Sequence, residues 1–135
     1  MPEDDHSPVE ILNRWNTVDI SEEGTFKYVL IEAYATEIIP GDQPEEKETS
    51  KLLVRGYNWA EYHADIYDPT EEKLRKKGLD AQCLGGGRII HKPQEKYIKV
   101  YGYSVGFGRA DHTKTVDVLK AYYPDYRIEW TNEGY

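Results

Sequence analysis

The alternation of hydrophobic and polar side chains predicts five strands. Residues 96–104 (KYIKVYGYS) alternate most regularly, and residues 24–38 (GTFKYVLIEAYATEI) combine partial alternation with β-branched and aromatic side chains. Both features are typical of strands that bury one face. The same criteria predict three shorter strands at residues 50–57, 80–91 and 126–130, the first of these with a run of Leu and Val and the second with three consecutive glycines.

Two helices are predicted between these strands. In residues 68–78 (DPTEEKLRKKG), Asp68 can cap a helix and Pro69 suits its first position. The same helix could instead begin near His63, with Pro69 inside it, and the sequence leaves this choice open. Residues 110–124 place apolar side chains on one helical face and predict the second helix.

The order of these elements, β-β-α-β-β-α-β, predicts an α+β fold. We expect a single domain with a mixed, mostly antiparallel central sheet of about five to six strands and two helices packed on it. This domain is expected to span residues 17–135, preceded by a disordered acidic tail at residues 1–16. Residues 40–48 (PGDQPEEKE) are predicted to form a charged loop.

Composition and charge narrow the class of function. The chain of 135 residues has a net charge of −8, whereas proteins that bind nucleic acids generally present a basic surface. A single cysteine, Cys83, cannot form an internal disulfide or a cysteine-based zinc site, which fits a reducing, cytoplasmic setting. No run is apolar enough to span a membrane and the N-terminus is polar, so we expect neither membrane contact nor a signal peptide. Nothing in the sequence suggests an oligomer, and we expect a monomer.

The first candidate for chemistry is His63, in the stretch GYNWAEYHADIYD (residues 56–68). A neutral histidine can accept a proton near pH 7. A lone histidine among aromatic side chains is also often structural, and the residues alone leave both roles open. Glu61 and Asp65 are each two positions from His63 and could orient its imidazole, but the spacing assigns this role to neither.

A second candidate is the glycine-rich segment 101–112 (YGYSVGFGRADH), which follows the most regular strand and enters the last helix. Glycines let a backbone turn and approach a ligand closely, and free amides at such a junction can bind an anion. The segment lacks the spacing of a P-loop or of a dinucleotide-binding fingerprint. It is therefore either an anion-binding loop or a tight connection without a ligand.

Several other residues have a plain structural explanation. Cys83 and Arg88 are separated by four residues, one fewer than in the C-x5-R loop of cysteine-dependent phosphatases, which disfavours thiolate catalysis. Arg88 could bind an anion or form a structural ion pair, and Lys27 could lie on a solvated strand face. His112 is expected at the surface, and His91 has no informative context. The histidines of the sequence match no metal-binding motif.

Five segments in the same order resemble one family. The stretches FKYVLI, VRGYNWAEYHADIYD, CLGGGRI, YGYSVGFGRADH and the ending YPDYRIEWTNEGY are similar to the Janus/Ocnus family of 14 kDa phosphohistidine phosphatases. The resemblance covers about residues 18–135 and implies a mixed α+β fold with two helices. It also implies phosphatase activity on phosphohistidine, and in some members phospholysine, without a metal or other cofactor. The implied partners are histidine-phosphorylated proteins or peptides.

By position, the resemblance implies seven site residues. His63 matches the essential histidine of the family, for which the implied role is that of proton acceptor. The other six match groups that hold or support the phosphate: Lys27, Ala64, Arg88, Ser104, Val105 and Gly106. Gly106 and Arg109 depart from some relatives, which have alanine and proline there, and these departures concern access of the substrate.

Two mechanisms and one non-catalytic role remain open at this point. Neutral His63 could deprotonate an attacking water, or it could take the phosphoryl group itself before hydrolysis. A module of the same fold could also bind phosphorylated proteins without turnover. The joint presence of His63, Lys27 and the glycine-rich loop favours the enzyme.

Overall fold

The structure is a computed structural model that describes residues 6–134. The described part of the chain contains six strands, three α-helices and one short 3-10 helix. In chain order these are α1 (Pro8–Arg14), β1 (Val18–Ile20), β2 (Gly24–Ile39), β3 (Glu45–Tyr57), α2 (His63–Lys76), β4 (Asp80–Lys92), η1 (Pro93–Glu95), β5 (Tyr97–Tyr101), α3 (His112–Tyr122) and β6 (Arg127–Trp130).

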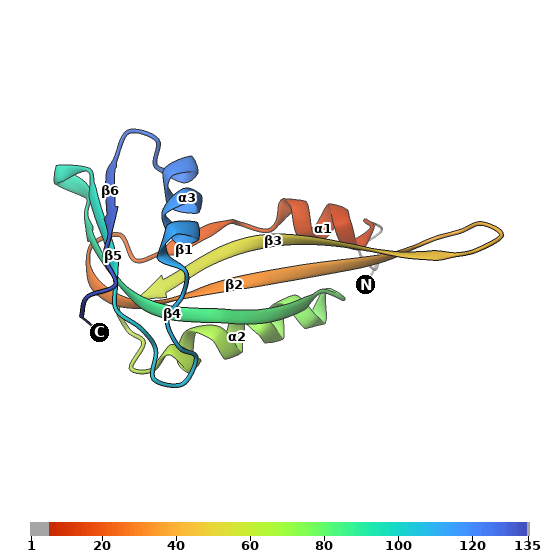
Figure 1. The fold of residues 1–135 in the computed structure, drawn as a ribbon, viewed down its shortest axis with the longest axis horizontal. Helices are drawn as coiled ribbons and strands as arrows, with labels where there is room; N and C mark the ends of the chain where they lie inside the picture. The colour runs from red at the N-terminus through yellow and green to blue at the C-terminus, as the bar shows by residue number, and fades with distance from the viewer. Residues whose placement is uncertain (1–5, 135) are drawn as a thin grey trace.

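All six strands form one sheet, in the order β1-β3-β2-β4-β5-β6. The four inner strands pair in antiparallel fashion, whereas β1 pairs with β3 and β6 pairs with β5 in parallel at the two edges. The predicted α+β class and the mixed, mostly antiparallel sheet are therefore confirmed (Figure 1).

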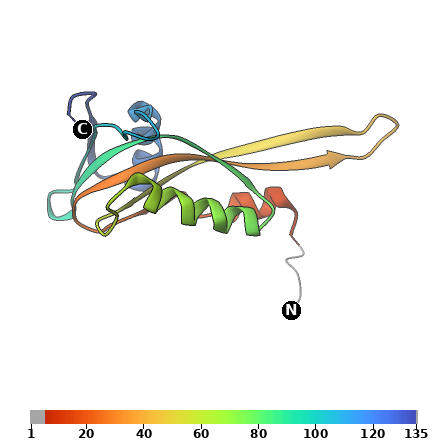
Figure 2. The ribbon, with the colours of Figure 1, turned by 90° about the horizontal axis from the view of Figure 1, so that it is seen from below.

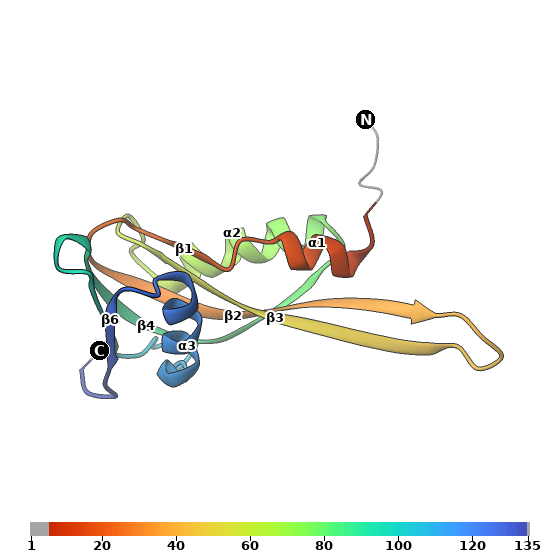
Figure 3. The same ribbon diagram turned by 90° about the horizontal axis from the view of Figure 1, so that it is seen from above.

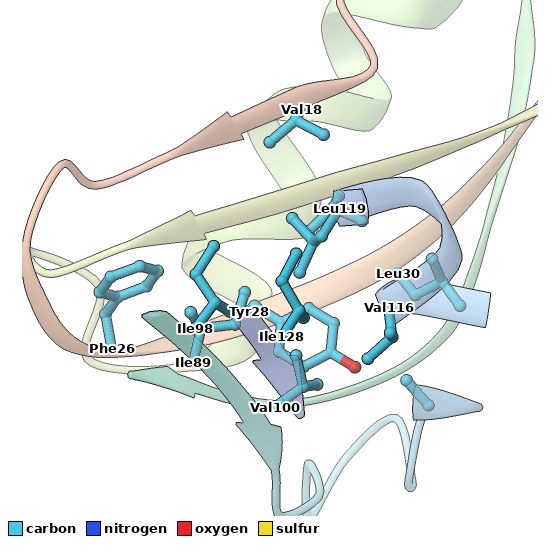
Figure 4. Close-up of a cluster of buried hydrophobic side chains, with 12 residues drawn as sticks. Val18, Phe26, Tyr28, Leu30, Ile89, Ile98, Val100, Val116, Leu119 and Ile128 are labelled. Atoms are coloured by element: carbon cyan, nitrogen blue, oxygen red, sulfur yellow. The ribbon is translucent and has the colours of Figure 1, made fainter. Parts of the chain in front are cut away.

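The helices cover both faces of the sheet because successive side chains of a strand point to opposite faces. On β2, Tyr28 and Leu30 pack in a core that includes residues of α3 (Figure 4), whereas Val29 and Ile31 pack in a second core with residues of α1 and α2. Figures 2 and 3 show α1 and α2 on one side of the sheet and α3 on the other. We call these the α1–α2 face and the α3 face.

A third helix, α1, occupies part of the segment that was expected to be disordered. The Ser7 hydroxyl accepts a hydrogen bond from the Glu10 amide and caps the helix, while Leu12 is fully buried in the core of the α1–α2 face. The Lys51 ammonium group on β3 donates to the carbonyls of Leu12, Asn13 and Trp15, where the helix ends. The prediction of disorder is thus wrong for this helix, and residues 1–5 lie outside the described residues.

The β2–β3 hairpin extends far beyond the other strands as a two-stranded arm (Figure 1). Pairing of β2 with β4 ends at Tyr34, but β2 and β3 continue to pair until Ile39 lies opposite Glu45. We call residues 35–49 the hairpin arm. The charged loop predicted at residues 40–48 is therefore too long, because residues 45–48 belong to β3.

Helix α2 begins at His63 and contains Pro69, so the second of the two starting points considered above is the right one. His63 is therefore the first residue of the helix. Backbone amides in the first turn of a helix have no hydrogen-bond acceptor within the helix. Strand β5 ends at Tyr101, earlier than predicted, and this leaves residues 102–111 as the connection to α3.

Candidate active site

A bulge in β4 precedes the part of that strand that contributes to the site. Leu30 and Ile31 of β2 pair with Gly85 and Cys83 of β4, so that Leu84 is an extra residue without a partner on β2. An extra residue of this kind reverses the side-chain alternation that follows it. Cys83 and Arg88, which simple alternation would put on opposite faces, consequently share the α1–α2 face.

The three consecutive glycines after the bulge let side chains approach β4 from both faces. A Cβ atom on Gly86 would lie 2.6 Å from Cδ2 of His63, on the α1–α2 face. A Cβ atom on Gly87 would lie 2.7 Å from Cε1 of His112, on the other face. A larger residue at position 86 or 87 would collide with one imidazole or the other, so these two glycines are required by the two histidines.

One nitrogen of the His63 ring is held by the backbone of β4. Nε2 lies 2.9 Å from the Gly87 carbonyl oxygen, which can only accept a hydrogen bond, so Nε2 carries the proton. Nδ1 is then the nitrogen with the free lone pair, and it has no partner among the described residues. The side chain is largely buried, and the arrangement fixes both the orientation and the tautomer of a potential base.

The surroundings of His63 lower its pKa below the usual value. Burial is the largest cause, and the positive charges of Lys27 and Arg88 act in the same direction, while the hydrogen bond to Gly87 opposes them. The position at the start of α2 also disfavours an imidazolium, because the helix dipole is positive there. His63 is therefore neutral at pH 7 and able to accept a proton.

Lys27 and Arg88 form a pair of like charges beside this histidine. Lys27 on β2 lies directly opposite Arg88 on β4, and neither makes an ion pair within residues 6–134. Arg88 Nε is in addition the one buried side-chain nitrogen or oxygen of the described residues that lacks a hydrogen-bond partner. Two unpaired cations side by side in a protein of net charge −8 indicate an anion site.

Replacing either cation by methionine is expected to weaken anion binding strongly without destabilising the free protein. Like charges directly opposite one another destabilise a sheet, so Lys27→Met should leave the Tm in phosphate-free buffer unchanged or slightly higher. The rise in Tm on adding a fixed concentration of inorganic phosphate should become much smaller. Lys47→Met is the matched control, since Lys47 lies opposite Glu37 on the hairpin arm and its loss removes a favourable pair. A phosphate response as large as that of the wild type in both Lys27→Met and Arg88→Met would contradict the anion site.

The connection before α3 forms a tight turn whose inner amides are unused. Ser104 and Gly108 exchange backbone hydrogen bonds of 3.0 and 2.8 Å, and the Ser104 hydroxyl accepts a bond of 3.1 Å from the Phe107 amide. The amides of Val105 and Gly106 have no acceptor in the described part of the chain. They are free to donate to an anion, as is the hydroxyl proton of Ser104.

These groups surround a single cavity of about 670 Å³ at the end of the sheet where α2 begins. The turn is anchored to β4 there, because Gly86 and Gly108, and Ala110 and Gly86, are joined by backbone hydrogen bonds of 3.0 and 3.1 Å. All seven site residues implied by the sequence line this cavity: Lys27, His63, Ala64, Arg88, Ser104, Val105 and Gly106. The other lining residues are aromatic: Tyr62, Tyr103 and Phe107.

Comparison with known proteins shows to which family the chain belongs. The family model described as Janus/Ocnus family (Ocnus) matches residues 12–127, which is most of the chain. The chain belongs to the Janus/Ocnus family. Its relatives include the 14 kDa phosphohistidine phosphatase of Sus scrofa, 54% identical over 118 residues that cover 87% of this chain and 90% of the relative.

Two further relatives show the breadth of the Janus/Ocnus family. The human protein named 14 kDa phosphohistidine phosphatase is 50% identical, with 87% of this chain and 91% of the relative covered. The sex-regulated protein janus-A of Drosophila pseudoobscura pseudoobscura is 52% identical, with 87% of this chain and 76% of the relative covered.

His112, which was expected at the surface, is instead buried in this Janus/Ocnus chain. Its Nε2 donates to the Gly102 carbonyl at 2.8 Å, and its Nδ1 accepts from the Tyr28 hydroxyl at 2.6 Å. The Thr115 hydroxyl lies 3.0 Å from the same phenol and donates to it. Burial lowers the pKa of His112, so it is a neutral structural residue that holds the connection before α3. The surface prediction is wrong because Gly87 leaves room for this ring.

The group that orients the His63 imidazole is a backbone carbonyl and neither of the two nearby carboxylates. Asp65 accepts a hydrogen bond of 2.8 Å from the Tyr62 amide and thereby closes the first turn of α2, and it makes no hydrogen bond to the imidazole. No hydrogen bond of Glu61 occurs within the described residues. The orienting group is the Gly87 carbonyl, which reasoning from the sequence missed, although the three consecutive glycines marked a close approach at this point.

Cys83 lies outside the cavity. Its thiol donates weakly to the Gly85 carbonyl at 3.6 Å, it does not line the cavity, and burial raises its pKa to about 11. Within residues 6–134, no group of three or more His, Cys, Asp or Glu side chains is placed to hold a metal ion. No helix in the same range is both long and apolar enough to span a membrane.

Proposed function

We propose that this protein is a phosphatase that hydrolyses the P–N bond of phosphohistidine in proteins, with His63 as the proton acceptor. The observation that carries this proposal is the neutral imidazole of His63, oriented by Gly87, beside the unpaired cations Lys27 and Arg88 in one cavity. Phospholysine has the same type of P–N bond and is a second possible substrate. The names of the mammalian relatives support the same activity.

In the proposed reaction, the chain holds the phosphoryl group and removes one proton. Lys27, Arg88 and the free amides around Val105 neutralise the phosphoryl oxygens, which is the dominant requirement in phosphoryl transfer. A water oxygen attacks phosphorus while Nδ1 of His63 takes one of its protons. Before the attack, the imidazole of phosphohistidine takes a proton from solvent on its other ring nitrogen, so the electron pair of the P–N bond leaves with a neutral imidazole and the products are phosphate and histidine.

His63 could alternatively act as the nucleophile through the same Nδ1 atom. Nδ1 would then attack phosphorus, the substrate nitrogen would leave, and water would hydrolyse the phosphorylated His63. Rapid quenching at alkaline pH during turnover distinguishes the two routes, because only the second adds a phosphoryl group to the peptide that contains His63. We favour the first route, and detection of that adduct at the rate of turnover would replace it with the second.

The lowered pKa of His63 predicts the pH dependence of activity. The base is lost on protonation, so kcat/KM should fall with a slope of one as the pH drops through a pKa below the usual ~6.5. Lys27 disfavours the imidazolium, and therefore Lys27→Met should raise this pKa and move the acid limb to higher pH. Profiles of kcat/KM for both proteins between about pH 4.5 and 8 would check the direction of the shift. A limb that stays in place or moves to lower pH would count against His63 as the base.

The direct test of the proposed function is phosphate release from a phosphohistidine peptide, with and without EDTA. We expect release in both conditions, because the proposed mechanism needs only side chains and amides of this chain. A phosphoserine peptide of the same sequence should be inert, since its ester oxygen is a poor leaving group without an acid. Binding of the phosphohistidine peptide without release would instead favour a non-catalytic phosphoprotein-binding module, the second function considered from the sequence.

The cytoplasmic location and the monomeric state expected from the sequence are part of the same proposal. Light scattering of the purified protein tests the monomer, and fractionation of cells that express it tests the location. The absence of nucleic-acid binding, expected from the net charge of −8, is tested by a shift assay at low salt.

A further inference from the structure

The cavity is larger and more apolar than a phosphoryl group requires. Its volume of about 670 Å³ is in the range that accommodates an organic ligand, and the basic groups occupy only part of its wall. Aromatic and aliphatic side chains form the remainder: Tyr62, Tyr103, Val105 and Phe107. We therefore expect a part of the substrate other than its phosphoryl group to contact these apolar side chains.

Exposed hydrophobic side chains gather on the two segments that flank the cavity. Trp59 and Tyr62, in the connection before α2, are each 63% exposed, and Val105, at the tip of the turn before α3, is 94% exposed. Tyr103 in the same turn is 39% exposed. Single exposed hydrophobic residues are ordinary on a protein surface, but a group of them around a functional cavity is typical of an interaction site.

Trp59 is held in place before any partner arrives. Its ring stacks on Tyr57 with centroids 5.1 Å apart and planes only 9° from parallel, and the Tyr57 hydroxyl donates to Asp19 at 2.7 Å. The next residue, Asn58, donates its amide to the Ser21 hydroxyl at 2.9 Å. A ring fixed in this way loses little conformational entropy on binding.

The stacked pair also lies next to the anion site. Tyr57 on β3 is directly opposite Lys27 on β2, and Lys27 is directly opposite Arg88 on β4, so the three side chains form one row on the α1–α2 face. On the other side of the cavity, the Phe107 ring packs edge-on against Tyr67 of α2 at 5.5 Å. The apolar side chains therefore lie next to Lys27 and Arg88, and they are held by contacts with β3 and α2.

We infer that Trp59, Tyr62 and Val105 form a docking surface for the polypeptide on either side of the phosphorylated residue, and that this surface favours an apolar side chain next to that residue. This inference rests on the proposed function. The occupant follows from continuity, because a side chain whose phosphoryl group reaches Lys27 and Arg88 must carry its backbone across the rim of the cavity. An apolar neighbour would lie against Trp59 and remove both surfaces from water.

The test compares substrates with and without a polypeptide. The substrates are phosphoramidate, which has a P–N bond but no flanking chain, and two phosphohistidine peptides that differ only in leucine or serine beside the phosphorylated residue. Trp59→Ala should lower kcat/KM for the leucine peptide by about tenfold or more, the effect typical of truncating a central aromatic contact. The serine peptide should lose less, and phosphoramidate should change by less than about twofold.

Two further variants separate docking from structural damage. Trp59→Phe keeps an apolar ring and should retain most of the activity on the leucine peptide. Trp130→Ala, which removes another exposed tryptophan on β6, should change none of the three rates. An equal loss for peptide and phosphoramidate in Trp59→Ala, or no loss for either, would overturn the inference.

The same peptides made with a non-hydrolysable phosphohistidine mimic keep this test independent of turnover. Their Kd values, measured by calorimetry for wild type and Trp59→Ala, should show the leucine preference in the wild type alone. If the wild type releases no phosphate yet shows this preference, the proposed phosphatase activity fails and the docking surface stands. If it releases phosphate but binds both mimics equally, the docking surface fails and the activity stands.

Discussion

Replacing His63 with alanine is expected to reduce phosphate release from a phosphohistidine peptide by about 10²–10⁴-fold, the contribution typical of a positioned base. Among the described residues that line the cavity, His63 is the only histidine, and its Nδ1 carries a free lone pair on a neutral, oriented ring. The effect should appear in kcat, because Lys27 and Arg88 still bind the phosphoryl group. Steady-state rates with the peptide substrate, together with the Tm response to inorganic phosphate, separate the lost chemistry from retained binding.

A matched control is available at an exposed histidine. His6→Ala removes an imidazole that pairs with Glu10 outside the cavity and should leave the rates unchanged. If His63→Ala kept most of the wild-type activity, the base would have to be sought elsewhere. If it lost activity together with the phosphate-induced rise in Tm, a folding defect or a binding role would explain the loss instead.

Substituting Gly86 by alanine is expected to lower kcat by about 10²-fold, although residue 86 bears no reactive group. The new Cβ atom would lie 2.6 Å from Cδ2 of His63 and 2.8 Å from the Tyr28 carbonyl oxygen, so the ring or the strand must move. A displacement of this size breaks the alignment between Nδ1 and the phosphoryl group. Crowding of this kind also costs about 1–3 kcal/mol of stability.

The control for this substitution is Gly41→Ala in the turn of the hairpin arm, where a Cβ atom would meet nothing within 4 Å. It should change neither the rate nor the Tm. The two variants are assayed on the same peptide, and unfolding is followed by calorimetry. Full activity in Gly86→Ala would mean that the contact between Gly86 and His63 does not determine the position of the imidazole.

The hydrophobic pattern predicted the strands and helices that bury one face. It missed α1 and the outer part of β3, which depend on contacts with distant parts of the chain. The inner strands were found because their alternate residues enter two separate cores. Helix α1 is only seven residues long, and it depends on the burial of Leu12 and on Lys51 from a distant strand. Residues 45–48 pair with β2 in a ribbon exposed to solvent, so no apolar alternation marks them as a strand.

The resemblance proposed seven residues for the site, and the structure places all seven around one cavity, but their geometry could not be predicted from the sequence. The Gly87 carbonyl and His63 are 24 residues apart, and the contact between them depends on the bulge at Leu84. Lys27 and Arg88 lie opposite one another because of the same strand register, which brings two cations together without an anionic partner. Pairings of this kind are set by tertiary structure and leave no local signal in a single sequence.

The tip of the hairpin arm lies far from the cavity, and this distance matters for protein engineering. Lys27 and Ile39 are twelve positions apart on β2, which corresponds to roughly 40 Å at about 3.3 Å per residue. The tip of the arm pairs with no other strand of the sheet, so an inserted peptide or fluorescent domain at residues 40–44 would strain neither core. A reporter placed there would mark the protein while leaving the approach of a phosphorylated polypeptide to the distant cavity unobstructed.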